Sequence, residues 1–370
     1  MKKIISCFLN SIFSLFKINN KKIIFQTGRG MIDGNPKAIY DYMKENNKDY
    51  KLIWLVTKDT NTSKLDEKHY TNHSLMGLYH LATAKYWIRS ESLGSILKKR
   101  KEQVYIQTWH GYGTMKKMGY DVNNAKERPP LDHVKEWDYL ITNDQVSEDI
   151  MLSSTGYNKE LAQIGTPRTD SILKNVQDDK FIKNLKKELH IPKNKKVILY
   201  APTFRDEQLD MENVDLKIDA LSNLKDYIIL TRVHPLIRHK INKTNNKNFI
   251  DVSLYPDVNE LLVITDILIT DYCSIVFEYA LLERPMIFYG YDYQEYLNTR
   301  GLYNEYPEDF PGDMVDTDEQ LVEIINNIEK YKRKTSKQIK EMNKKYNLLN
   351  NGQVCKKFVE MLEEGYFNKK

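Results

Sequence analysis

The chain of 370 residues has few cysteines, and that scarcity limits what it can be. Its three cysteines, Cys7, Cys273 and Cys355, lie far apart and match neither a metal-ligand spacing nor a disulfide framework. A reducing compartment is therefore the expected environment. Because 41% of the residues are hydrophobic and 29% charged, a disordered chain, a collagen and a disulfide-stapled mini-protein are excluded.

The chain also lacks a long apolar run near its N-terminus. The uncharged stretch 4–16 is shorter than the roughly 20 residues that a bilayer core requires. No small-residue cleavage site follows it, so a secretory signal is not expected. As a helix, this stretch leaves a narrow polar stripe of Ser6, Asn10, Ser14 and Lys17 between apolar side chains. That pattern predicts an amphipathic helix at a membrane surface, and the alternative is a helix packed on the protein's own surface.

Positive charge is concentrated in two short segments, although the whole chain carries only +5. Residues 1–22 contain five lysines and no acid, and residues 329–345 have a local charge of +6, which leaves −6 on the remainder. This distribution favours docking on an anionic surface, and we expect no nucleic-acid partner. For the segment 329–345, the alternative is a solvated helical face.

Apolar runs of strand length alternate with helical patterns in two series. We predict the strands 22–27, 50–57, 84–90, 104–109, 139–142 and 161–165 in the first series, and 195–203, 227–235, 249–253, 266–272 and 285–291 in the second. Helices are expected at 35–46 and 74–84. Strands that alternate with helices form parallel sheets. The expected fold is α/β, with two Rossmann-like domains facing a central cleft and ligands at the carboxyl ends of the strands.

The polar segment 174–196 separates the two series and predicts a helix followed by a linker. We therefore expect four parts: a membrane-associating segment 1–20, an acceptor and membrane-side domain 21–190, a donor-binding domain 191–317, and C-terminal helices 318–370 that pack on both domains. The sequence contains no internal repeat and no low-complexity tract.

One histidine stands out in the first series. His110 directly follows an apolar strand and precedes Gly111 and, one residue later, Gly113, so the backbone there can approach a ligand closely. An unperturbed imidazole has a pKa near 6.5, which suits a general base at neutral pH. The alternative is a histidine whose ring is satisfied by local backbone groups.

Strand ends of the second series carry hydroxyls, cations, an imidazole and carboxylates: Thr203, Arg205, Arg232, His234, Thr270, Asp271, Ser274 and Glu278. Ser274 precedes a helical stretch at 275–280, where free N–H groups favour a phosphate. Glu278, one turn further, suits a ribose hydroxyl. The alternatives are that Ser274 only caps the helix and that Arg205 forms a surface ion pair.

A family resemblance rests on these and further ordered blocks. The run 108–119 together with Asp121 resembles the TWHGTxxKxxGxD signature of the CDP-glycerol glycerophosphotransferases of teichoic acid synthesis. The segments around FQT and GNPKAIY, the blocks LYAPTFRD, RVHP, DILITDYCSIVFEY and PMIFYGYDYQEY, and residues 300–303 and 310–312 are also similar to that family. The resemblance covers residues 22–316.

This resemblance implies a GT-B fold and a peripheral enzyme at the cytoplasmic face of the bacterial cell membrane. It implies transfer of glycerol phosphate from CDP-glycerol to an undecaprenyl-diphosphate-linked acceptor, a lipid-linked disaccharide or polyol phosphate, with release of CMP. By motif, His110 would be the general base, His234 a ligand of the donor pyrophosphate, and Thr270, Asp271 and Ser274 the donor-phosphate loop. The acceptor side would comprise Gly111, Tyr112, Lys116, Lys117 and Asp121.

The sequence departs from the family pattern at three places. Tyr112-Gly113 replaces the usual Thr-Pro, and Cys273 and Thr27 each stand where serine is usual. Acceptor and polyol identity therefore stay open, and the alternatives are a CDP-ribitol-dependent or capsule polyol-phosphate transferase. More distant ones are a nucleotide-sugar glycosyltransferase or isomerase and a lipid-binding scaffold. No cofactor is required by the motifs, although Asp206 and Asp271 leave one Mg²⁺ site open.

Overall fold

A computed structural model of the chain describes residues 2–28, 32–46, 48–58, 60, 62, 68–90, 96–112, 115–122, 133–205, 208, 210–214, 216, 219–234, 237–242, 246–306 and 308–368. It contains two compact units. Unit 1 comprises Met1–Tyr112, Met118–Asp170 and Leu349–Lys370, and unit 2 comprises Gly113–Lys117 and Ser171–Leu348. The main segment of unit 2 therefore begins before the expected boundary at residue 190. Unit 2 also includes Gly113–Lys117, which lies within the expected first domain.

Unit 1 is built on a parallel seven-stranded sheet in the order β3-β2-β1-β4-β5-β6-β7. Its strands are β1 (Asn19–Gln26), β2 (Lys51–Val56), β3 (His69–Thr71), β4 (Ala84–Arg89), β5 (Val104–Gln107), β6 (Tyr139–Thr142) and β7 (Glu160–Gln163). Successive residues of β1 alternate between two cores, with Ile23 and Phe25 on one face of the sheet and Ile24 on the other. A strand buried on both faces must be apolar throughout, which explains the continuous apolar runs in the sequence.

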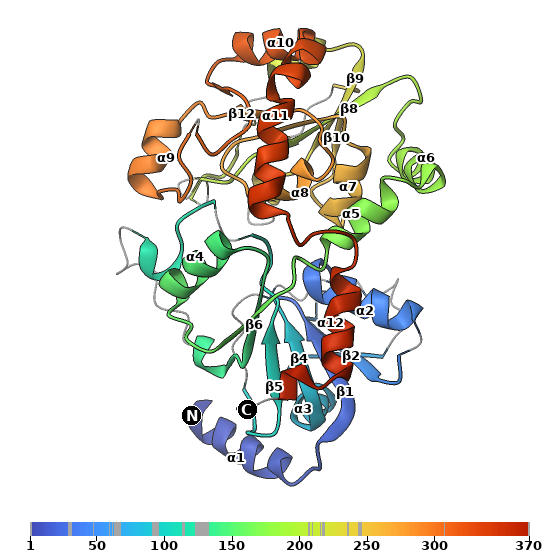
Figure 1. The fold of residues 1–370 in the computed structure, drawn as a ribbon, viewed down its shortest axis with the longest axis vertical. Coiled ribbons are helices and arrows are strands. Elements are labelled where there is room, and N and C mark those ends of the chain that lie inside the picture. The colour runs from blue at the N-terminus through green and yellow to red at the C-terminus, as the bar shows by residue number, and fades with distance from the viewer. Residues whose placement is uncertain are drawn as a thin grey trace. The chain divides into compact units, whose positions relative to one another are not determined.

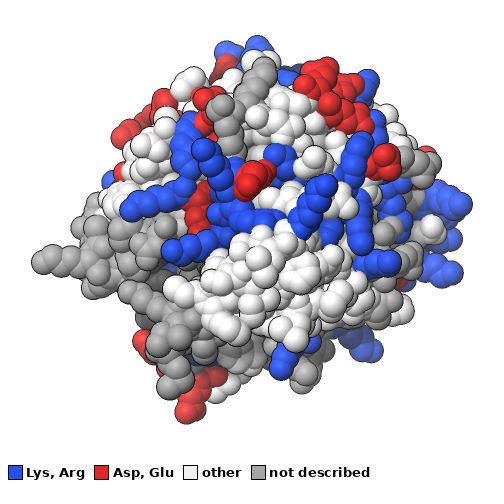
Figure 2. All heavy atoms as spheres, turned by 90° about the horizontal axis from the view of Figure 1, so that it is seen from below, with Lys and Arg blue, Asp and Glu red and all other residues white. Residues whose placement is uncertain are grey.

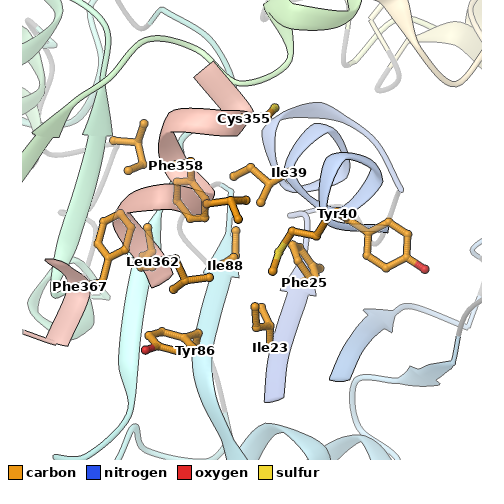
Figure 3. Close-up of a cluster of buried hydrophobic side chains, with 14 of the residues drawn as sticks. Ile23, Phe25, Ile39, Tyr40, Tyr86, Ile88, Cys355, Phe358, Leu362 and Phe367 are labelled. Atoms are coloured by element: carbon orange, nitrogen blue, oxygen red, sulfur yellow. The ribbon is translucent and has the colours of Figure 1, made fainter. Parts of the chain in front are cut away.

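The helices of unit 1 are α1 (Lys2–Ser14), α2 (Gly34–Glu45), α3 (Leu75–Thr83), α4 (Gln145–Thr155) and α12 (Val354–Glu363). The division between the units lies within α5 (Thr169–Asn175). The last helix of the chain, α12, packs beside α2 from the opposite end of the sequence (Figure 1). Figure 3 shows Phe358 and Leu362 of α12 against Ile39 of α2 and Ile88 of β4, within one buried cluster.

Unit 2 repeats this plan with a parallel six-stranded sheet in the order β10-β9-β8-β11-β12-β13. Its strands are β8 (Lys196–Ala201), β9 (Tyr227–Thr231), β10 (Phe249–Asp251), β11 (Ile267–Thr270), β12 (Met286–Tyr289) and β13 (Met314–Val315). Its helices are α6 (Asp179–Glu188), α7 (Val258–Ile264), α8 (Ile275–Ala280), α9 (Tyr293–Thr299), α10 (Asp318–Asn326) and α11 (Ile328–Tyr346).

Every predicted strand is present, and the expectation of two parallel-sheet α/β domains is confirmed. Two strands were not predicted. The edge strands β3 and β13 have only three and two residues, too few for a periodic pattern to appear. In each sheet the strand order reverses at one point, between β1 and β4 and between β8 and β11, and this is where ligands bind in such folds.

The basic segment 329–345 lies in α11, whose buried stripe consists of Ile328, Tyr331, Thr335, Ile339, Met342 and Tyr346. That stripe has helical spacing, so the lysines lie on the opposite face. Lys334 pairs with Asp313 and Lys345 pairs with Asp309. The alternative of a solvated helical face accounts for this segment.

The N-terminal segment is helical, as predicted, and one side of α1 packs on unit 1. Phe13 is buried, and the Asn10 amide donates to the Ile96 carbonyl and accepts from the Lys98 amide. Arg100 donates to the carbonyl oxygens of Ser14 and Phe16, at the C-terminal end of the helix where a cation is favoured. None of the helices in the described part of the chain has the length and apolar character needed to cross a membrane.

The packing of α12 on unit 1 can be tested at Phe358, whose side chain is fully buried. We expect Phe358→Ala to lower the free energy of unfolding by about 3–5 kcal/mol, because it leaves a cavity between α12 and the sheet. Denaturant unfolding of the full chain measures this loss. Lys357→Ala, on the exposed side of the same helix, is the matched control and should change stability by no more than about 0.5 kcal/mol. Equal losses in the two variants would contradict the packing of α12 described above.

Candidate active site

The predicted donor residues of unit 2 gather at the point where its strand order reverses. The neighbouring strands β8 and β11 end at Ala201 and Thr270, and the segments that contain Thr203, Arg205, Asp271 and Ser274 follow them directly. The carboxyl ends of neighbouring parallel strands meet at one edge of the sheet, so these side chains come together as predicted.

Arg205 forms the centre of a buried ionic network. Its guanidinium donates to Asp271 at 2.9 Å and, through Nε and Nη2, to both carboxylate oxygens of Asp292. Asp292 also accepts a hydrogen bond of 2.9 Å from the Tyr272 hydroxyl. Although burial alone would raise it, the bond from Arg205 holds the pKa of Asp292 below its usual value. Arg205 therefore does not form the surface ion pair considered as the alternative, and its expected contact with the donor pyrophosphate stays a prediction.

Asp271 and Thr270 also hold the loops in place. One oxygen of Asp271 accepts from the backbone amides of Thr203 and Tyr272, and its other oxygen accepts from Arg205. The Thr270 hydroxyl donates to the Ala201 carbonyl at 2.7 Å. Both side chains are buried, so their contacts join the loop after β8 to the loop after β11.

Three other predicted donor residues belong to these loops and to α8. The Oγ1 atom of Thr203 is buried without a hydrogen-bond partner among the described residues, and the side chain of Glu278 is also buried. A buried polar atom without a partner is costly, and a bound ligand is one way to satisfy it. Ser274 precedes the first residue of α8, but its side chain forms no capping hydrogen bond, so the simple N-cap interpretation does not fit.

The remaining two donor residues follow β9. The ring of His234 stacks on Phe204 with centroids 4.4 Å apart, which brings it beside the loop after β8. Arg232 donates to the backbone carbonyls of Val252 and Tyr255, so its guanidinium braces the loop after β10. Phe204 and Arg205 line a pocket of about 140 Å³ together with Lys116, Asp292 and residues of α9.

In unit 1, His110 follows a strained turn at the end of β5. Trp109 has a φ of 53°, in the left-handed region that a bulky residue rarely adopts, at a cost of about 1–3 kcal/mol. The Trp109 amide donates to the Gln107 side chain, and its ring lies 4.6 Å from the ring of His110. The His110 side chain is exposed at the carboxyl edge of the sheet.

Asn35 holds this turn from α2. Its buried amide donates to the carbonyl oxygens of Thr108 and Trp109, at 2.8 Å and 3.2 Å, and its oxygen accepts from the Arg168 amide. These bonds satisfy both carbonyl groups of the strained turn at once. Asn35 therefore fixes the backbone from which His110 projects.

The predicted acceptor-side residues are divided between the two units. Tyr112 is buried, and its hydroxyl accepts from the Asn350 amide at 2.6 Å. Lys116 and Lys117 belong to unit 2, whereas Asp121 of unit 1 accepts from the Ser153 hydroxyl. The structure thus corrects Tyr112 from a surface facing the acceptor to a packing residue. Gly111 directly follows His110, and Gly113 lies outside the described residues.

The Mg²⁺ site that the sequence leaves open rests on Asp206 and Asp271. Asp206 lies outside the described residues, and both oxygens of Asp271 are engaged as above. Within the described ranges, no group of three or more histidine, cysteine, aspartate or glutamate side chains could hold a metal ion. The three cysteines are free thiols.

The sequence profile of the family described as CDP-glycerol:poly(glycerophosphate) glycerophosphotransferase matches residues 8–364. The chain belongs to this family. A teichoic acid poly(glycerol phosphate) polymerase of Bacillus spizizenii is 35% identical over 95% of this chain and 94% of that protein. A teichoic acid glycerol-phosphate transferase of Staphylococcus aureus is 33% identical over 89% of this chain and 90% of that protein. The chain spans only 47% of a polymerase of the same name from Bacillus subtilis, to which it is 35% identical.

Solved structures agree with this family membership. The wall teichoic acid polymerase TagF superposes with a TM-score of 0.87 at 28% identity, covering 97% of this glycerophosphotransferase and 93% of that chain. One similar structure is a histidine-to-asparagine variant of TagF soaked with CDPG. S. aureus MnaA with UDP, at 13% identity and a TM-score of 0.55, shares the fold alone.

Sequence reasoning did not assign roles to Asn35 or Asp292 in this glycerophosphotransferase, although both lie in blocks that carry the family resemblance. Asn35 belongs to the GNPKAIY segment, and Asp292 to PMIFYGYDYQEY. The signal in the sequence was that each is a polar residue within a motif whose other residues form a helix or a strand. The groups that each side chain contacts in the fold could not be predicted from the sequence.

The hydrogen bonds from Asn35 to the turn before His110, which we call the Asn35 clamp, can be tested through turnover of the glycerophosphotransferase. We expect Asn35→Asp to lower kcat by about 10²-fold and leave the Kd for CDP-glycerol unchanged, because the carboxylate cannot donate to the turn and His110 is displaced. Asn35→Ala should behave in the same way, and Lys44→Ala, on the exposed side of α2, is the matched control. A normal kcat in Asn35→Asp would contradict the clamp.

Proposed function

We propose that the protein transfers glycerol phosphate from CDP-glycerol to an undecaprenyl-diphosphate-linked acceptor in teichoic acid synthesis, with release of CMP. The observation that carries this proposal is the strained Trp109 turn, which presents His110 at a strand end within the family's motif. Family membership supports the donor, since relatives over nearly the full length are named for glycerol phosphate. The TagF structure soaked with CDPG supports the same donor.

In this proposal unit 2 binds the donor. The diphosphate lies at the loops after β8 and β11, where His234 and Ser274 contact its oxygens. Glu278 accepts from a ribose hydroxyl. Phosphoryl transfer needs mainly positioning and charge neutralisation, which a rigid set of loops supports. The buried Oγ1 atom of Thr203, which has no hydrogen-bond partner among the described residues, supports a ligand at this edge of the sheet.

His110 acts as general base in the same proposal. It removes the proton from the acceptor hydroxyl, whose oxygen attacks the β-phosphorus as the bond to CMP breaks. The held turn supports this role, because a base must be fixed within hydrogen-bond reach of the proton it takes. The CDP-ribitol alternative stays open, since a poly(ribitol-phosphate) polymerase of B. spizizenii is 32% identical over 88% of this chain.

The two histidines should separate in kinetics. We expect His110→Ala to lower kcat by about 10²–10⁴-fold with CDP-glycerol binding retained, since a general base acts in the chemical step. His234→Ala should weaken CDP-glycerol binding. Mass spectrometry of products from CDP-glycerol and CDP-ribitol, each with a lipid-linked disaccharide acceptor, identifies the unit added. His239→Ala, on an exposed part of unit 2, is the control. Near-normal turnover in His110→Ala would overturn the assignment.

We also propose that α1 docks the enzyme on the cytoplasmic face of the cell membrane. Phe8 and Ile12 remain exposed on α1, and Leu15 is exposed directly after it, although the other side of α1 packs on unit 1. Leu75 and Met76 are exposed at the start of α3. The face seen in Figure 2 shows uncharged surface bordered by lysine and arginine side chains. Exposed apolar groups next to cations suit an interface of anionic headgroups and acyl chains.

Membrane docking can be tested by placing charge on the exposed side of α1. We expect Leu15→Glu, at a residue 85% exposed, to reduce co-flotation with vesicles that contain anionic lipid, because a carboxylate opposes both burial and attraction. Leu348→Glu is the matched control on unit 2, at a residue 76% exposed. Equal flotation of the two variants would contradict the role of α1. Flotation of a chain without residues 1–18 that equals that of the full chain would also contradict it.

A further inference from the structure

Two segments far apart in the sequence pair within unit 2. The Lys117 amide donates to the Gly301 carbonyl at 3.1 Å, and the Tyr303 amide donates to the Met115 carbonyl at 3.0 Å. Between these bonds, Lys116 and Leu302 form an antiparallel bridge. Gly301 has a φ of +78°, and a β-carbon there would lie 3.0 Å from the Lys117 side chain. The pairing therefore fixes Lys116 against the end of α9.

This pairing closes one wall of the 140 Å³ pocket. Helix α9 supplies Glu295, Tyr296 and Thr299, and its C-cap residue Arg300 also lines the pocket. Glu295 and Thr299, and Tyr296 and Arg300, are each four residues apart and so lie on the same side of the helix. Phe204, Arg205 and Asp292 complete the lining. The lining contains three cationic side chains, Lys116, Arg205 and Arg300, and two carboxylates, Asp292 and Glu295, so positive charge is in excess. The pocket is therefore suited to an anion that also carries hydrogen-bonding groups.

The size of the pocket limits its ligand. Pockets for whole drug-sized ligands have volumes of roughly 300–1,000 Å³, whereas this one has about 140 Å³. A nucleotide does not fit, but a phosphate with a short polyol does. Its place in the fold selects the donor: Phe204 lines the pocket and stacks on His234, which lies at the proposed diphosphate site. Burial raises the pKa of the Cys273 thiol, and the nearby charge of Lys116 opposes that rise, so Lys116 lies close to the loop after β11.

We propose that this pocket holds the glycerol phosphate group of the donor, with Lys116 and Arg300 on its phosphate and Glu295 and Thr299 on its hydroxyls. The inference rests on the function proposed above and adds the residues that recognise the transferred group. It assigns Lys116 to donor binding, in place of the acceptor contact expected from the motif. It also assigns the choice of polyol to α9, whose Glu295 and Thr299 lie in the lining of the pocket.

The test compares ligands with and without the polyol phosphate, by calorimetry on the full chain. We expect Arg300→Gln and Lys116→Gln each to weaken CDP-glycerol binding by roughly tenfold or more, because each removes a charged hydrogen-bond donor. Binding of CMP should be unchanged, since it lacks the group in question. Lys334→Gln, whose side chain is 58% exposed and lies outside the pocket lining, is the matched control.

A second part of the experiment tests recognition of the glycerol hydroxyl groups of the donor. Thr299→Val keeps the shape of the side chain, and we expect it to weaken CDP-glycerol binding while CMP binding and thermal unfolding stay unchanged. Three results would overturn the inference: unchanged CDP-glycerol binding in all variants, an equal loss of CMP binding, or a raised KM for the acceptor alone. Failure of the wild-type chain to bind CDP-glycerol would instead overturn the proposed function.

Discussion

The buried contact of Arg205 with Asp271 and Asp292 is the constraint on which the architecture of unit 2 depends. It ties together the loops that follow β8, β11 and β12, at the edge where the strand order reverses. A buried ion pair is a weak source of net stability, but loss of one partner costs about 3–5 kcal/mol because a charge is left buried and unpaired. The rings of Tyr272 and Tyr296 lie about 5 Å from the guanidinium and exclude water from it. The main effect of the network is therefore to fix a single arrangement of the loops, and its contribution to the stability of the fold is smaller.

In unit 1, the described hydrogen bonds that hold the turn before His110 come from neutral side chains. The turn that presents His110 is strained at Trp109, and neutral amides from Asn35 and Gln107 hold it. The difference is chemically consistent with the roles proposed for the two units. A fixed carboxylate or guanidinium next to a general base shifts the pKa of that base, whereas neutral amide groups can hold the backbone without adding a charge.

The sequence was sufficient for the sheets but not for the site. Strands such as β1 are buried on both faces, so their apolar runs were visible, and the turn after β5 was predicted to carry His110. The pairing of individual charges could not be predicted. Arg205 and Asp271 were expected at neighbouring strand ends, but the partner Asp292 lies after another strand, and a single sequence does not show which side chains pair. Lys116 was expected on the acceptor side because of the family motif, and its backbone pairing with residues 301–303 in unit 2 could not be predicted from that motif.

Burial explains one departure from the family pattern, the tyrosine at position 112. Tyr112, which replaces the usual threonine beside the proposed base, is 1% exposed and bonded to Asn350, so it contributes packing in unit 1 and no surface for a substrate. Asn350 in turn accepts from the Thr166 amide and lies next to the start of α12. A larger residue at position 112 thus joins the loop after His110 to the returning C-terminal segment. Polyol choice is then better sought on α9, where Glu295 and Thr299 line the pocket of unit 2.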